Sequence, residues 1–296
     1  MRWLEGPGPS DAGLRLARLL DDDRAIAVPG VFNGLTSLLA SRAGAEALYL
    51  SGAALSASMG LPDIGLLTLD DVVRAVRQIT RVTDVPLIVD ADTGFGGPLL
   101  AMRAVRELED AGAAAIQIED QEDPKRCGHL DGKRVIGVAE MQEKVTAAAA
   151  ARSEMLVIAR TDARATGGVD DAIARGRAYR DAGAHVIFPE ALGSEDEFAN
   201  YARSVDGPLL ANMTEFGRGP NLSVARLEEL GYRLVIFPVS AARVAARQVR
   251  SFYGDLLRDG IQTGWLERML TRRELYELIG YDAYAELDRS LARDDP

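Results

Sequence analysis

The chain has 296 residues, of which 47% are hydrophobic and 27% charged, a balance typical of globular proteins and unlike that of disordered or fibrous chains. Its formal net charge of −11 repels phosphate backbones and no basic cluster offsets it, so we expect no nucleic-acid partner. One cysteine, no apolar signal core at the N-terminus and no run of about 18 apolar residues favour a cytoplasmic protein without a membrane span.

Short apolar runs recur along the chain, separated by segments with apolar residues three and four positions apart. Residues 10–21 are predicted to form a first helix. Runs this short and continuously apolar are typical of strands buried on both faces, as in a parallel sheet. The predicted strands are Ala25–Pro29, Ala47–Leu50, Pro86–Val89, Ala114–Ile118, Leu156–Ala159, His185–Phe188, Pro208–Ala211 and Leu234–Phe237. The clearest predicted helices between them are Leu69–Thr80, Leu100–Ala111, Ala139–Ala151 and Asp170–Ala182.

A short internal repeat supports this succession of elements. Ala-Gly-Ala at residues 43–45, 111–113 and 182–184 ends a predicted helix and precedes a predicted strand. Glycine just past a helix end supplies the left-handed residue that such turns need. Eight strand–helix alternations favour an α/β fold of the (β/α)8 TIM barrel type over an open doubly wound sheet. We expect residues 1–241 to form this barrel with its N-terminal helix, and residues 242–296 to form a helical C-terminal extension.

Polar side chains follow almost every predicted strand. In a (β/α)8 barrel the active site forms at the carboxyl ends of the strands, so these residues are candidates for a common site. A single polar strand end often only caps the next helix, but a whole ring of them favours function. The candidates are Tyr49, Ser51, Gly52, Asp90, Asp92, Glu119, Arg160, Glu190, Asn212, Met213, Thr214 and, one turn after the eighth strand, Arg243.

Two of these candidates form a possible metal site. Asp90 and Asp92 are two positions apart, so they share one face of a strand, where a cation would remove their mutual repulsion. Glu119 would complete a site made only of oxygen ligands, which favours Mg²⁺ or Mn²⁺ over Zn²⁺. The alternative is that Asp92 caps the next helix while Asp90 pairs with Arg160.

The segment Lys125-Arg126-Cys127-Gly128-His129 follows the fourth predicted strand. Neighbouring cations would stabilise a thiolate and lower the pKa of Cys127, as a catalytic acid or base requires. Gly128 and Gly132 would let this loop fold over the mouth of the barrel. The alternative is an ordinary surface loop.

At these residues the sequence resembles the isocitrate lyase/phosphoenolpyruvate mutase superfamily, from about Ile26 to Leu291. The Lys-Arg-Cys-Gly-His string is typical of its lyase branches, and Ala53 stands where many members have glycine. The small set Phe188, Ile236 and Pro238 suits the branch whose substrate carries an extra methyl group. The most specific matching segments are Tyr49–Ala53, Leu61–Asp63, Val89–Gly96, Ile118–Gln121, Lys125–His129, Ala159–Ala163, Phe188–Ala191, Asn212–Gly217 and Thr271–Tyr276.

The resemblance implies an Mg²⁺-dependent lyase, with Mn²⁺ as a substitute, that cleaves (2S,3R)-2-methylisocitrate to pyruvate and succinate in propionate catabolism. Asp90 and Asp92 would hold the metal, and Cys127 would protonate the succinate carbanion. The remaining catalytic candidates are Lys125 and His129 beside the cysteine, and Tyr49, Asp63 and Glu119 for the first proton transfer. The implied substrate-binding residues are Ser51, Gly52, Ala53 and Arg160 for pyruvate, and Gly128, Glu190, Asn212, Met213, Thr214, Arg243 and Arg272 for succinate.

The resemblance also implies a homotetramer whose subunits exchange a C-terminal helix. Two competing hypotheses remain. One is a sister lyase that acts on 2,3-dimethylmalate, isocitrate or oxaloacetate. The other, of a different class, is a non-catalytic barrel that binds a small carboxylate.

Overall fold

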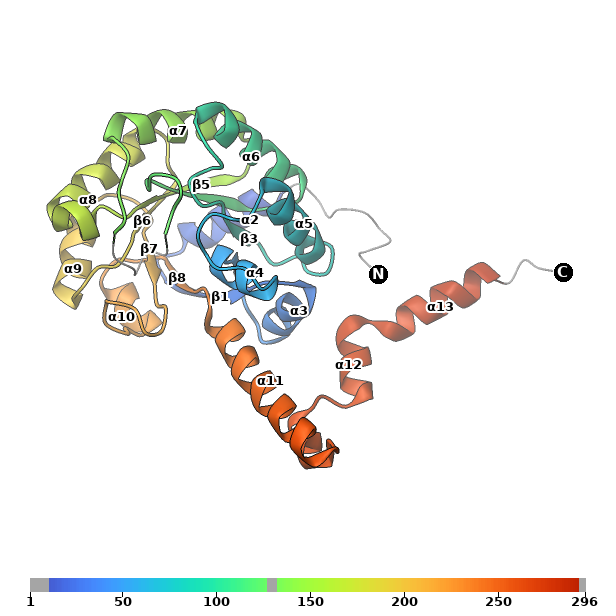
Figure 1. Cartoon of the computed structure of the whole chain (residues 1–296). Coiled ribbons are helices and arrows are strands. Elements are labelled where there is room, and N and C mark those ends of the chain that lie inside the picture. Colours follow the sequence, from blue (N-terminus) through green and yellow to red (C-terminus); the bar gives the residue numbers. More distant parts are fainter. Residues whose placement is uncertain (1–10, 127–131, 293–296) are drawn as a thin grey trace.

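The computed structural model describes residues 11–126 and 132–292, and its centre is a barrel of eight parallel strands (Figure 1). Hydrogen bonding follows the order β6-β5-β4-β3-β2-β1-β8-β7. A parallel bridge between Ile187 and Leu209 joins the two outer strands and closes the ring. The predicted TIM barrel is therefore confirmed. The strands are β1 (Ile26–Val31), β2 (Leu48–Leu50), β3 (Leu87–Asp90), β4 (Ala115–Glu119), β5 (Leu156–Thr161), β6 (Val186–Pro189), β7 (Leu210–Asn212) and β8 (Leu234–Phe237).

Helices surround the strands, and their ends follow local sequence signals. A capping box of Thr68 and Asp71 begins α5, the helix predicted at Leu69–Thr80. Gly112 and Gly183, from the Ala-Gly-Ala repeat, take left-handed φ values of 94° and 106° after their helices. The helices of the barrel are α2 (Ala12–Asp21), α3 (Gly34–Arg42), α4 (Gly52–Ser58), α5 (Leu69–Thr80), α6 (Pro98–Asp110), α7 (Val138–Ala151), α8 (Arg164–Asp181), α9 (Glu195–Ser204) and α10 (Val224–Glu229).

Alternation along each strand divides the core into two layers. Side chains that point outward pack beneath the helices, as Leu87 and Val89 do on β3. Side chains that point inward fill the barrel, as Ile158 and Phe188 do. The period of two that separates these layers also sends the last inward residue of each strand toward the carboxyl end of the barrel.

Helix α2 closes the opposite, amino-terminal end of the barrel. Leu16 of α2 is fully buried among the inward-facing strand residues. Gly13 lies so close to the strand side that a Cβ atom there would stand 2.1 Å from the carbonyl oxygen of Glu154. Only glycine allows the helix to come this close to Glu154, so the closed end of the barrel depends on both Gly13 and Leu16.

Several strands extend one or two residues beyond their predicted ends. β3 includes Asp90, β4 includes Glu119 and β5 includes Arg160 and Thr161. The sequence pattern predicts shorter strands because each apolar run ends before these polar residues. Their backbones pair in the ladder all the same, as Glu119 does with Arg160. These carboxylates and the guanidinium therefore stand on the rigid sheet rather than on loops.

After β8 the chain leaves the barrel as an arm of helices (Figure 1). None of the residues of α11 is buried, and Leu257 on it is 85% exposed. Arg42 of α3 donates a hydrogen bond to the carbonyl oxygen of Glu277, which links the arm to the barrel. The arm consists of α11 (Ser240–Asp259), the 3-10 helix η1 (Thr263–Arg268), α12 (Arg272–Ile279) and α13 (Tyr281–Leu291). Across the described part of the chain, no helix combines the length and apolarity that crossing a bilayer requires.

We predict that Leu16→Ala destabilises the protein by about 2–5 kcal/mol, because it leaves a cavity at the barrel floor. Leu14→Ala, at a position of the same helix that is 42% exposed, is the matched control and should cost much less. Urea unfolding followed by circular dichroism measures both. Equal losses for the two variants would show that α2 is not a part of the barrel core.

Candidate active site

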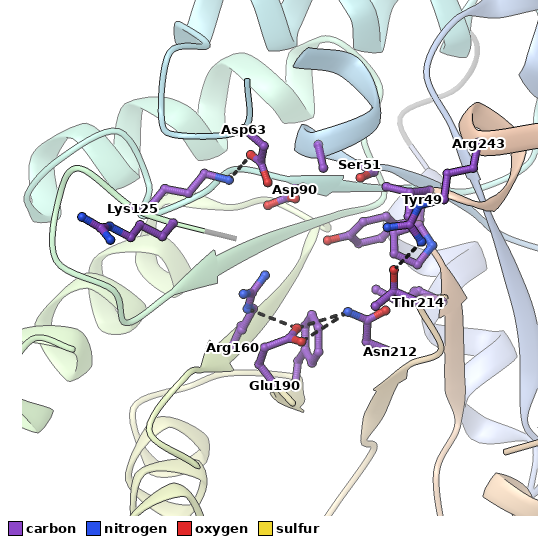
Figure 2. Close-up of a pocket in the computed structure, with 16 residues that line it drawn as sticks. Tyr49, Ser51, Asp63, Asp90, Lys125, Arg160, Glu190, Asn212, Thr214 and Arg243 are labelled. Carbon is purple, nitrogen blue, oxygen red and sulfur yellow. Dashed lines mark hydrogen bonds and ion pairs between the residues drawn. The ribbon is translucent and has the colours of Figure 1, made fainter. Parts of the chain in front are cut away.

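A pocket of about 560 Å³, open to solvent, lies at the carboxyl ends of the strands (Figure 2). The inward positions of the strands explain its walls. Glu190 stands two residues beyond the core residue Phe188, and Arg160 two beyond Ile158. The predicted residues among its lining are Tyr49, Ser51, Ala53, Asp63, Asp90, Lys125, Arg160, Glu190, Asn212, Thr214 and Arg243, joined by Arg126, Phe188, Ile236, Pro238 and Val239.

One wall carries three aspartates around a buried lysine. The ammonium of Lys125 contacts Asp63 and lies 2.8 Å from Asp92 Oδ1. Burial alone would lower the pKa of Lys125, but the surrounding carboxylates, Asp92 first among them, raise it above its usual value. Asp90 accepts hydrogen bonds from the backbone N–H groups of Gly52 and Asp92, at 3.1 and 3.3 Å. Lys125 is therefore a fixed cation in an acidic wall.

This wall has the features of a cation site. Burial, and next the charge of Asp90, raise the pKa of Asp92 to about 6 although Lys125 opposes the shift. A Cβ atom at Gly52 would lie 3.1 Å from Asp90 Oδ2, so glycine leaves the space in front of both carboxylates open. Two neighbouring carboxylates with one lysine beside them suit a hard divalent cation, which takes oxygen ligands.

The alternative roles considered for the two aspartates do not hold. The N-cap of α6, the next helix, is Gly97, which provides no side-chain cap. Arg160 forms ion pairs with Glu119, Asp162 and Glu190 instead of Asp90. No group of three or more His, Cys, Asp or Glu side chains arranged to hold a metal occurs within residues 11–126 and 132–292. Asp90 and Asp92 remain the candidate protein ligands of a cation here, while Glu119 lies against Arg160.

The base of the pocket is built around Arg160. Its guanidinium lies 5.3 Å from the centre of the Phe188 ring and 3.1 Å from Glu119 Oε2. Burial raises the pKa of Glu119 well above its usual range, although Arg160 opposes the shift. The other oxygen of Glu119, Oε1, has no hydrogen-bond partner among the described residues. Glu119 is thus a buried carboxyl group that favours its protonated form.

A buried network holds Arg160 in place. Asp162 accepts two hydrogen bonds from the guanidinium, at 3.0 and 3.1 Å, and a third at 2.7 Å from Lys133. The backbone N–H of Asp162 donates to Asp120, which also accepts from the hydroxyl groups of Thr161 and Tyr179. Because two nitrogens of the guanidinium donate to the buried carboxylate of Asp162, the guanidinium has one orientation. The remaining N–H donors of Arg160 therefore point in a fixed direction.

The opposite wall carries a second arginine. Arg243, at the start of α11, donates to Thr214 Oγ1 at 3.3 Å and to the carboxylate of Glu215 at 2.7 Å. Asn212 on β7 donates to Glu190 at 3.2 Å, and its own Oδ1 lacks a partner in the described part of the chain. Figure 2 shows Arg243 and Arg160 on separate sides of the pocket. The pocket can therefore bind carboxylates at two places.

Not every predicted site residue reaches the pocket. Met213 is a correction, because strand alternation turns its side chain outward, where its sulfur accepts a hydrogen bond from the Leu222 N–H. Arg272 begins α12 on the arm, exposed and away from the pocket lining of its own chain. Cys127, Gly128 and His129 lie outside the described residues.

Two residues near the pocket had not been singled out from the sequence. Gln117 accepts a hydrogen bond from the hydroxyl of Tyr49 at 2.6 Å, and Lys133 contacts Asp162. A signal existed for Gln117, since it is the one polar residue inside the predicted strand Ala114–Ile118 and shares a face with Glu119. Nothing in the sequence separates Lys133 from other loop lysines.

Comparisons with known proteins agree with this geometry. The family model described as phosphoenolpyruvate phosphomutase matches residues 16–257. The chain is 49% identical to the 2-methylisocitrate lyase of Aeropyrum pernix over 95% of its own length and 91% of the relative's. It is 44% identical to the 2-methylisocitrate lyase of Bacillus subtilis, with coverage of 99% and 98%.

Solved structures share the whole fold. The crystal structure of 2,3-dimethylmalate lyase, described as a PEP mutase/isocitrate lyase superfamily member, is 38% identical with a TM-score of 0.90 and covers 97% of both chains. That of phosphonopyruvate hydrolase in complex with oxalate and Mg²⁺ is 31% identical with a TM-score of 0.86, covering 94% of this chain and 98% of the other.

We predict that stabilisation by Mg²⁺ depends on pH through Asp92, whose folded-state pKa is about 6. Because the pKa of Asp92 is raised in the folded protein, the folded state becomes less stable as pH rises from about 4 through 6 and Asp92 loses its proton. Bound Mg²⁺ should restore this lost stability. Below pH 6 protons compete with the cation. The rise in Tm with Mg²⁺, measured calorimetrically, should therefore be larger at about pH 7.5 than at about pH 5.

Asp92→Asn is the control for this measurement, and its Mg²⁺-dependent rise in Tm should be small at both pH values. If the wild type gains equally at both, Asp92 is not a ligand of the cation.

Proposed function

The chain belongs to the phosphoenolpyruvate mutase/isocitrate lyase family, and from this premise we propose that it is a lyase that cleaves the carbon–carbon bond of 2-methylisocitrate to give pyruvate and succinate. The observation that carries the proposal is the pocket with two arginines, Arg160 and Arg243, on separate walls beside the Asp90–Asp92 pair. A substrate with carboxylates at both ends suits this arrangement. A non-catalytic barrel would not need the acidic pair or the Lys-Arg-Cys-Gly-His sequence at residues 125–129.

We propose that Asp90 and Asp92 hold a divalent cation, Mg²⁺ with Mn²⁺ as a substitute. When bound there, it supplies a Lewis acid for the hydroxyl and carboxylate oxygens of the substrate. Ser51, Gly52, Ala53 and Arg160 orient the part of the substrate that becomes pyruvate. Arg243, Thr214, Asn212 and Glu190 orient the part that becomes succinate, a role that the family resemblance also gives to Gly128.

The chemical step needs one proton acceptor and one proton donor. A carboxylate takes the hydroxyl proton, and Asp63 at the pocket wall suits this role better than Glu119, whose buried carboxyl group favours its protonated form. Tyr49 is unsuited to this role, because burial and the nearby Asp90 raise the pKa of its phenol well above the usual value. As the carbon–carbon bond breaks, its electron pair passes to the succinate carbon and the hydroxyl oxygen becomes the carbonyl of pyruvate. The thiol of Cys127, beside Lys125 and His129, protonates that carbon.

We further propose that the protein works as a cytoplasmic homotetramer and that the arm packs on a neighbouring subunit. The arm exposes apolar side chains along its length, among them Val244, Tyr253 and Leu257. A patch of this kind on one element is typical of a protein–protein interface. Arg272, which does not reach the pocket of its own chain, would then contribute to the pocket of a partner.

The direct test of the function is the release of pyruvate from 2-methylisocitrate, isocitrate, 2,3-dimethylmalate and oxaloacetate, with Mg²⁺ and with excess chelator. We expect turnover of 2-methylisocitrate that chelator abolishes and Mg²⁺ restores. Preference for 2,3-dimethylmalate would show instead that this protein has the activity of the structurally similar 2,3-dimethylmalate lyase. Binding of these acids without turnover would leave only the non-catalytic barrel.

Substrate choice should depend on the apolar side of the pocket. Phe188, Ile236 and Pro238 leave room for the substrate's extra methyl group, so 2-methylisocitrate should be favoured over isocitrate by about 10–200-fold in kcat/KM. Phe188→Trp fills part of that room and should reduce the ratio, whereas Leu99→Trp, at an 81% exposed position outside the pocket lining, should leave it unchanged. An unchanged ratio in Phe188→Trp would show that this side chain does not set the preference.

Cys127→Ser should lower kcat by about 10²–10⁴-fold with little change in substrate affinity, because a serine hydroxyl is much less acidic than a thiol. Arg160 and Arg243 still bind the carboxylates in this variant. Thiol alkylation should inactivate the wild type, and the lesion can be assigned because the chain has one cysteine. A near-normal kcat in Cys127→Ser would mean that another group protonates the carbanion.

A further inference from the structure

A hydrogen bond inside the barrel joins the pocket to a residue that lies beneath it. The hydroxyl of Tyr49, on β2, donates to Oε1 of Gln117, on β4, at 2.6 Å. Tyr49 lines the pocket and is drawn with the other pocket side chains in Figure 2, whereas Gln117 is fully buried. Gln117 therefore reaches the pocket only through Tyr49.

The amide of Gln117 is only half satisfied. Its Nε2 is buried and has no hydrogen-bond partner within the described residues. A phenol has one proton, whereas an amide offers an acceptor on one side and donors on the other. Whichever side of the amide faces Tyr49, the opposite side is left without a partner. In the observed orientation the unpaired side is the NH₂ group, and a buried unpaired donor is less common in proteins than a buried unpaired carbonyl.

The two amide orientations give Tyr49 opposite roles. In the observed one, the phenol proton points to Gln117, and the phenol oxygen can only accept a hydrogen bond in the pocket. If the amide turns over, Nε2 donates to the phenol oxygen, and the phenol proton becomes available to the pocket. The second orientation exchanges the unpaired donor for an unpaired acceptor, so each state leaves one side of the buried amide unpaired.

We propose that Gln117 is a positioning residue for Tyr49, and that rotation of its amide sets whether Tyr49 accepts or donates a hydrogen bond in the pocket. This inference rests on the proposed lyase function. In that reaction a substrate hydroxyl, which donates, becomes a product carbonyl, which only accepts. A phenol that can reverse its hydrogen bond matches both states. The phenol keeps its own proton throughout, and no bond other than hydrogen bonds is exchanged in this step.

A double-mutant cycle with Tyr49→Phe and Gln117→Met tests the proposal. Methionine has the shape of glutamine without its polar atoms. We expect each single change to lower kcat by roughly 10- to 100-fold, the worth of one strong hydrogen bond in the transition state. In the Tyr49→Phe background, Gln117→Met should cost nothing further, because Gln117 acts only through the phenol. Multiplicative losses in the double variant would overturn the proposal.

Two controls separate positioning from a structural role. Ile116→Met changes a buried neighbour on the same strand that faces outward, and should leave kcat within about twofold of the wild type. Gln117→His should recover much of the activity lost in Gln117→Met, because an imidazole presents either an acceptor or a donor nitrogen according to its tautomer. If histidine is no better than methionine, a reversible partner is not what Tyr49 requires.

A readout independent of turnover is the ¹³C NMR spectrum of protein labelled with ¹³Cζ-tyrosine. The signal that disappears in Tyr49→Phe is the signal of Tyr49. Gln117→Met should shift that signal, and Ile116→Met should not. A wild type that releases no pyruvate from any acid of the panel would refute the proposed function. An unshifted Tyr49 signal in Gln117→Met would refute the positioning role, whatever the activity of the wild type.

Discussion

The site at the carboxyl end of this barrel depends on how a surplus of negative charge is balanced. Six acidic side chains lie there near three cations: Asp63, Asp90, Asp92, Glu119, Asp162 and Glu190 near Lys125, Lys133 and Arg160. Lys125 faces Asp63 and Asp92, while Arg160 lies among Glu119, Asp162 and Glu190. Asp162 shares its charge with Lys133 as well. Burial makes unpaired carboxylates costly, so their pKa values rise or a cation must enter. Burial raises the pKa values of both Asp92, beside Lys125, and Glu119, beside Arg160, so both ends of the site carry more negative charge than the cations balance.

The barrel determines where this charge can lie. Strand alternation delivers an inward side chain every second residue, so apolar layers fill the core and the next inward position reaches the rim. Phe188 on β6 and Glu190 just beyond it illustrate this succession, since Phe188 packs in the core below and Glu190 follows it at the rim, and both line the pocket. The same rule places the apolar side chains of Phe188 and Ile236 beside charged ones in the pocket lining. Such a cavity can distinguish the hydrocarbon part of a substrate from its carboxylates.

Much of the fold and of the acidic wall could be predicted from sequence because each depends on local pattern. Asp90 and Asp92 follow an apolar run directly, and the strand that precedes them fixes their direction. The side chain of Met213 lies outside the pocket although its neighbours Asn212 and Thr214 line it, because alternation turns every second residue away. Gln117 could not be assigned a role, since its partner Tyr49 lies 68 positions away and only barrel closure brings them together. For the same reason no local pattern shows whether Arg272 on the arm serves its own chain or another.

In the proposed function, the Asp90–Asp92 pair holds a divalent cation. Titration of the apo protein with Mn²⁺, followed by electron paramagnetic resonance, measures this directly by counting bound ions per chain. We predict one bound Mn²⁺ per chain in the wild type and none in the double variant Asp90→Asn, Asp92→Asn, which must first be shown to unfold at a temperature close to that of the wild type. Stoichiometric Mn²⁺ binding that persists in the double variant would contradict the account, because the cation would then be held elsewhere.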